Sequence, residues 1–102
     1  MKELIQRIVQ KREKRGFVND PLKIQLMITE EVGEISRELK KSWSMNYEDF
    51  DKDKLAEEIA DTFTLLAALA NAFDIDIQEA VESKFFGADE KRKWKSEQDS
   101  FQ

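Results

Sequence analysis

Two acidic motifs are the part of this sequence most able to do chemistry. The first, Glu-Glu-Val-Gly-Glu, spans residues 30–34, and the second, Glu-Glu-Ile-Ala-Asp, spans residues 57–61. Each lies in a stretch whose apolar residues recur with helical spacing, so each places carboxylates one turn apart on one side of its helix. Facing carboxylates repel one another, and their hard oxygen atoms suit Mg²⁺ or Mn²⁺ as a compensating cation. The motifs therefore predict a divalent metal site between two helices.

The composition excludes several other kinds of chemistry. The 102 residues fit one domain, and they include neither cysteine nor histidine, so disulfides, thiol nucleophiles, His-based dyads and Cys- or His-ligated zinc are excluded. The formal charge of −5 argues against a nucleic-acid binder that relies on positive charge. No apolar run is long enough to span a membrane, and no signal-peptide core follows the first residues. We expect a cytoplasmic protein without membrane contact.

The distribution of helix breakers predicts an all-α fold. Only three glycines and one proline interrupt segments rich in Glu, Lys, Leu, Ala and Ile. We expect four helices, over residues 2–14, 21–42, 54–73 and 77–86. The second should begin at the cap and proline of Asn19-Asp20-Pro21, and the third should be capped by an aspartate of residues 49–53. A single domain is expected over residues 1–94, followed by a polar tail over 95–102 that is a candidate for disorder.

The second helix mixes an apolar face with a glutamate. Its inner face is expected from residues at helical spacing, namely Ile24, Ile28, Val32, Ile35 and Leu39. On a helical wheel Glu31 falls inside this apolar arc, where an unpaired charge is costly. This position favours Glu31 and its neighbour Glu34 over Glu30 as metal ligands.

The third and fourth helices suggest an oligomer. The third helix is apolar on almost every side over residues 63–70, so it must be covered all round. The fourth is expected to direct Ala80, Val81 and Phe85 inward. A chain of this length has too few helices to supply the cover alone, so we expect the helices to pack into a homo-oligomeric bundle, a homodimer or a dimer of dimers.

A pair of antiparallel acidic helices would bring the two motifs together. The expected ligands are the i and i+3 carboxylates of the two motifs, Glu31, Glu34, Glu58 and Asp61. Magnesium bound by carboxylates usually takes further ligands from water and phosphate oxygens, which points to hydrolysis at phosphorus. Basic residues expected at the rim are Lys84, Lys91 and Arg92. The alternative is that the glutamates, such as Glu30, Glu38 and Glu57, form ordinary salt bridges on solvated helices.

The combined pattern resembles the MazG-type all-α nucleoside triphosphate pyrophosphohydrolases. The resemblance is carried by Glu31-Val32-Gly33-Glu34, by Glu58-Ile59-Ala60-Asp61 and by the Asp-Ile stretch before a helix that ends near Lys84, and it covers residues 24–92. It implies a helical core that dimerises, often into tetramers. It also implies hydrolysis of an NTP or dNTP between the α- and β-phosphates, giving a monophosphate and pyrophosphate, with the four carboxylates on Mg²⁺ and a role in clearing unwanted nucleotides.

The resemblance implies residues that contact the substrate, and the sequence departs from the family pattern after Lys84. Lys84 matches a lysine that the family uses near the phosphates. Relatives commonly continue Lys-x-x-x-Asn-x-x-Arg, whereas this chain has Ala88 in place of the asparagine and Arg92 one residue late, which bears on recognition of the base or sugar. Trp43 resembles a tryptophan that some relatives place against the nucleobase. Ordinary packing of Trp43 onto the core is the alternative.

Two other functions fit the same residues. The chain could be a non-catalytic helical dimer that binds a nucleotide or a protein, with the altered region after Lys84 marking lost turnover. It could also be a phosphoribosyl-ATP pyrophosphohydrolase, which does a related reaction on a similar scaffold. The preferred base and sugar, and the number of metal ions per site, are left open by the sequence.

Overall fold

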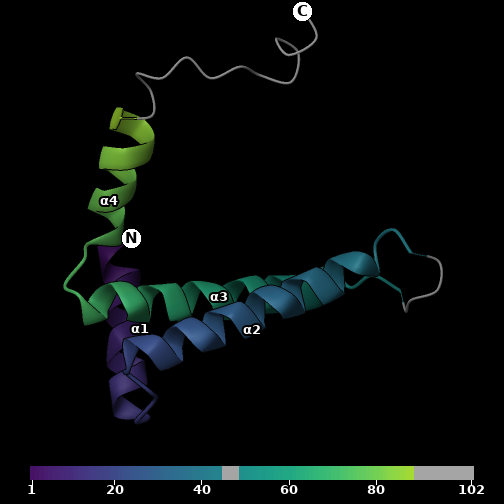
Figure 1. Ribbon diagram of the computed structural model, residues 1–102, viewed down its shortest axis with the longest axis horizontal. Coiled ribbons are helices and arrows are strands. Elements are labelled where there is room, and N and C mark those ends of the chain that lie inside the picture. The colour runs from purple at the N-terminus through teal and green to yellow at the C-terminus, as the bar shows by residue number, and fades with distance from the viewer. Residues whose placement is uncertain (45–48, 89–102) are drawn as a thin grey trace, which may run out of the picture.

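The chain is all-α, as the composition predicts. The computed structural model describes residues 1–44 and 49–88, and within these ranges it contains helices and no strand (Figure 1). The elements in chain order are α1 (Lys2–Lys14), α2 (Pro21–Lys40), α3 (Lys52–Ala72), α4 (Ile77–Ser83) and a π-helical turn (Lys84–Ala88).

The helices α2 and α3 form a long antiparallel hairpin that is the main packing unit (Figure 1). Helix α1 crosses the hairpin at the end where α2 begins and α3 finishes, and it packs on α3. Helix α4 leads away from that same end. The connection between α2 and α3 lies at the opposite end of the hairpin, so the two acidic motifs lie between the crossing helix and the connection.

The core is small and sits between α2 and α3. It consists of Ile24 and Ile28 from α2 and Leu65 and Ala68 from α3, with the partly buried Leu69 packed against it. Ile24 is completely shielded from solvent. Burying a side chain of this size contributes about 1.5–3 kcal/mol. The burial of these side chains therefore helps to hold the two helices together.

The predicted inner face of α2 is partly wrong. Val32 and Leu39 are nearly half exposed, and Glu38 is buried with only 3% of its surface accessible. The reason is the helical period of 3.6 residues, since repeated steps of four rotate a side chain progressively away from the contact line. The actual line alternates steps of four and three, so it reaches Glu31 and later Glu38 instead of Val32 and Leu39.

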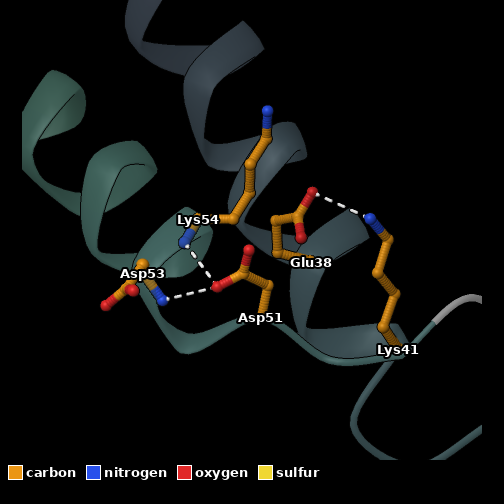
Figure 2. Close-up of polar contacts among 5 residues, drawn as sticks. All are labelled: Glu38, Lys41, Asp51, Asp53 and Lys54. Carbon is orange, nitrogen blue, oxygen red and sulfur yellow. Dashed lines mark hydrogen bonds and ion pairs between the residues drawn. The ribbon is translucent and has the colours of Figure 1, made fainter.

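Local polar contacts mark the two helix ends at the far end of the hairpin. The Glu38 carboxylate forms an ion pair with Lys41 at 3.2 Å, and the Asp51 carboxylate accepts hydrogen bonds from the backbone N–H groups of Asp53 (2.9 Å) and Lys54 (3.3 Å) (Figure 2). Because Asp51 is the N-cap, α3 begins at Lys52, two residues before the predicted start. Helix α2 likewise ends at Lys40, two residues before its predicted end.

The predicted burial of the α4 face is wrong for the single chain. Val81 is 46% and Phe85 is 64% exposed, and Ala80 is exposed as well. Asp76 caps α4 by accepting from the Glu79 backbone N–H at 3.1 Å, but α4 makes few contacts with the hairpin. The residues predicted to face inward therefore have no hairpin surface to cover them.

None of the helices in residues 1–44 and 49–88 combines the length and the apolar character that crossing a bilayer requires.

Replacing the α3 cap tests the local signal that starts this helix. Asp51→Ala removes the acceptor for two backbone N–H groups, so the free energy of unfolding should fall by about 0.5–2 kcal/mol. Urea denaturation followed by circular dichroism measures the loss. Asp49→Ala, an exposed aspartate just before the cap, is the matched control and should change stability by less than about 0.5 kcal/mol. Equal losses in both variants would contradict the capping role.

Candidate metal centre

The contact line that forms the apolar core continues into the acidic motifs. On α2, Ile28 is followed three residues later by Glu31, and on α3, Leu65 is preceded four and seven residues earlier by Asp61 and Glu58. These spacings keep each set on one face of its helix. The carboxylates of Glu31, Glu58 and Asp61 each offer an oxygen within 4.8 Å of the others. The next layer of the hairpin interface is therefore acidic.

The ionised form of Glu31 is disfavoured in this layer. Its pKa is raised above the ordinary value near 4.5, chiefly because partial burial penalises the ionised carboxylate. A side-chain hydrogen bond to Glu58 and the charges of Glu58, Asp61 and Glu34 raise it further. One oxygen of Glu31, Oε2, is shielded from solvent and has no hydrogen-bond partner within the described residues. A buried, unpartnered carboxylate oxygen is what a bound cation would satisfy.

A pocket of about 410 Å³ opens beside the acidic layer. It is lined by the end of α1 and the turn after it, by α2 and by α3, through Arg12, Gly16, Phe17, Val18, Met27, Glu31, Asp61, Thr64 and Leu65. Two members of the acidic group, Glu31 and Asp61, thus line the pocket. The remaining wall is mainly apolar, and its volume is in the range of small-molecule sites.

The end of α1 shapes one side of this pocket through a specific helix stop. Gly16 has a φ of +65°, and the backbone N–H groups of Gly16 and Phe17 donate to the carbonyls of Glu13 (3.1 Å) and Arg12 (3.0 Å). This pair of bonds is the Schellman motif, in which the second residue past the helix contacts its third-last residue. Here that contact is Phe17 on Arg12, with the guanidinium carbon 5.4 Å from the ring centre.

Arg12 and Phe17 were absent from the residues proposed from sequence. A signal was present, because Arg12 follows Ile8 by four residues and so continues the apolar stripe of α1. Only 7% of the Arg12 surface is accessible, and its Nη2 donates to the Val18 carbonyl at 2.7 Å. A charged residue on an apolar stripe is a candidate site residue, as Glu31 on α2 is.

The structure does not bring all of the proposed site residues to the pocket. Glu34 lies one turn past Glu31 and adds its charge there, but it is outside the group of three. Trp43 is 74% exposed at the far end of α2. Lys84 begins the π-helical turn and lines a different, apolar hollow with Phe85. Lys91 and Arg92 lie outside the described residues.

The helical hairpin, with three carboxylates gathered between its helices, defines an all-α domain with a candidate metal site. The family model for the MazG nucleotide pyrophosphohydrolase domain matches residues 19–86, which include both acidic motifs. The chain belongs to this family.

A curated relative matches over 69 residues of the chain. The chain is 35% identical over 69 residues to the uncharacterized protein YpjD of Bacillus subtilis (strain 168), covering 66% of this chain and 61% of that protein. The chain thus spans about three-fifths of the relative's length. The comparison with solved structures gives no significant match.

The raised pKa of Glu31 makes a stability prediction for the metal-free protein. Because the folded state disfavours the ionised carboxylate, the free energy of unfolding should rise as the pH falls through the folded pKa toward 4.5. Glu31→Gln should remove this dependence and, near neutral pH with EDTA present, stabilise the protein by about 0.5–2 kcal/mol.

Thermal unfolding across a pH series measures this effect. Glu30→Gln is the matched control, since Glu30 is adjacent and exposed, and its pH profile should follow the wild type. A Glu31→Gln variant that is less stable than the wild type at neutral pH would contradict the proposed repulsion.

Proposed function

We propose that the protein is a Mg²⁺-dependent nucleoside triphosphate pyrophosphohydrolase that cleaves a (d)NTP to the monophosphate and pyrophosphate. The observation that carries the proposal is the convergence of Glu31, Glu58 and Asp61 within 4.8 Å beside a pocket. Membership of the MazG family supports the reaction class. Clearance of unwanted nucleotides is the corresponding cellular role.

The residues present fit a hard divalent cation. Three carboxylates from two helices supply oxygen ligands, and Oε2 of Glu31 lacks any other partner in the described chain. Glu34, whose charge already acts on Glu31, is the proposed fourth ligand. Mg²⁺ is preferred because it binds through a few carboxylates together with phosphate oxygens, and Mn²⁺ has the same ligand preference.

The chain's own groups would position the substrate and handle the proton. When bound, the divalent ion would supply charge neutralisation for the phosphates and acidify a water molecule. The four carboxylates fix where the triphosphate lies, and one of their oxygens accepts the proton of the attacking water. The apolar pocket wall beside Glu31 and Asp61 holds the nucleoside and limits the access of bulk water.

The position of α4 supports a homodimer as the active form. Lys84 is not part of the acidic pocket in the single chain, and the adjoining α4 surface exposes Val81, Phe85 and Phe86. A second copy packed on this surface would bury these side chains and bring a basic region to the phosphates. Trp43, Lys91 and Arg92 remain proposed substrate contacts in that assembly.

A non-catalytic nucleotide-binding dimer is the second candidate. The observation that favours it is the separation of Lys84 from the carboxylates, together with the altered sequence at Ala88. Calorimetry with Mg²⁺ would detect nucleotide binding, and the absence of any product over a panel of triphosphates, including phosphoribosyl-ATP, would select this function over hydrolysis.

Removing one ligand tests the proposed reaction. Wild-type protein should release pyrophosphate, and not orthophosphate, from at least one triphosphate when Mg²⁺ is present, and EDTA should stop the release. Asp61→Ala and Glu58→Ala should lower kcat by at least about 100-fold because they remove oxygens that hold the cation. Glu57→Ala, an exposed neighbour on α3, should retain activity. Full activity in Asp61→Ala would contradict the assignment.

Charging the α4 surface tests the assembly. Phe85→Glu places a carboxylate in the proposed apolar contact, so the sedimentation coefficient should shift from dimer to monomer. Glu82→Lys keeps a charged side chain at a nearby exposed position and should leave the dimer intact. A wild-type protein that sediments as a monomer at all concentrations would exclude this assembly.

A further inference from the structure

The pocket beside the acidic layer has a second polar group that the metal chemistry does not use. Arg12 is 93% buried, as its 7% accessible surface indicates, and it lines the pocket from the α1 side. Its Nε is shielded from solvent and has no hydrogen-bond partner within residues 1–44 and 49–88. A buried N–H without an acceptor is unfavourable. An occupant that brings an acceptor to Arg12 would remove this penalty.

The setting of Arg12 identifies what kind of acceptor fits. The guanidinium is held between the Val18 carbonyl, at 2.7 Å, and the Phe17 ring, so its orientation is fixed before any ligand binds. The wall next to it is apolar, through Phe17, Val18 and Met27. A phosphate would be poorly solvated against such a wall, whereas a flat ring with apolar faces and a polar edge suits it.

We propose that Arg12 selects nucleotides whose base carries a carbonyl oxygen. The carboxylates of Glu31 and Asp61 take the metal-bound phosphates, and the apolar wall of Phe17, Val18 and Met27 takes the base with its carbonyl toward the guanidinium. Arginine has five N–H donors and no acceptor. A base carbonyl therefore accepts a hydrogen bond from Arg12. An exocyclic amino group at the same position would place its N–H donors against the N–H donors of the guanidinium. This assignment rests on the proposed function, because it places the base relative to the phosphates.

The matched substrates for this proposal are inosine and adenosine triphosphate. They differ at position 6 of the purine, which is a carbonyl in the first and an amino group in the second, and at the adjacent N1, which carries a proton in the first and is an acceptor in the second. The wild type should favour inosine triphosphate in kcat/KM by about tenfold or more, since a site built around a hydrogen bond rejects the substrate that cannot make it. The difference should lie mainly in KM.

Two variants and one control test the role of Arg12. Arg12→Lys keeps the charge but removes Nε and the planar fork, and it should reduce the inosine preference to within about threefold. Phe17→Leu should reduce the preference as well, and it makes smaller demands on folding because Phe17 is 47% exposed. Arg7→Lys, the same substitution at an exposed position of α1, should leave the preference unchanged. Circular dichroism checks that each variant keeps its helices.

Binding of the monophosphates separates this proposal from the reaction itself. Calorimetry with inosine and adenosine monophosphate in the presence of Mg²⁺ needs no turnover, and the wild type should bind the inosine compound more tightly. The proposal is overturned if Arg12→Lys and Phe17→Leu keep the wild-type preference. It is also overturned if these variants lower kcat/KM for both substrates by the same factor, which is the result that a phosphate contact or a purely structural role would give. A wild type that shows the binding preference but hydrolyses no triphosphate would leave the pocket assignment standing and remove the proposed function.

Discussion

The repulsion between carboxylates at the α2–α3 interface is the constraint on which the rest of the structure depends. Two helices that face each other with Glu31 on one side and Glu58 and Asp61 on the other would separate if nothing else held them. The apolar contacts of Ile24 and Ile28 with Leu65 and Ala68 hold the adjoining part of the hairpin together. The acidic layer lies directly beside this core, so the apolar packing keeps its oxygens close despite their charge.

Along the same pair of helices, one set of residues stabilises the fold and the neighbouring set forms the candidate site. The same face of α2 supplies an apolar contact at Ile28 and a destabilising carboxylate one turn later at Glu31, so neither half of the hairpin could be exchanged for the other. A cation would convert the repulsion into attraction, and the energy it contributes would be coupled to the folded state. The helix-stop geometry at Gly16 and Phe17 adds the pocket wall without disturbing this layer.

The sequence predicted the elements that depend on local signals. The caps at Asp20 and Asp51 act within a few residues, so the starts of α2 and α3 followed closely from them. Glu31 was predicted to lie within the contact face because the 3.6-residue period places it there. The remaining predicted face failed at Val32 and Leu39, since steps of four drift around the helix.

Features that depend on distant parts of the chain were not accessible from the sequence. The direction of α4 depends on what it packs against, so no periodicity could establish whether Val81 and Phe85 are covered. Arg12 could be noticed on its stripe, but its role requires knowing that the turn after α1 lies across α2 and α3. The placement of Lys84 away from the acidic group has the same cause.

The small size of the buried core has a consequence for how this protein behaves as it is diluted. Within the described chain only Ile24, Ile28, Leu65, Ala67 and Ala68 are buried apolar residues, which is little for a domain that must offset its conformational entropy. If copies of the chain cover each other's α4 surfaces, mass action links folding to the amount of protein present. The melting temperature would then rise with protein concentration, and the cell could tune the folded fraction simply through expression level.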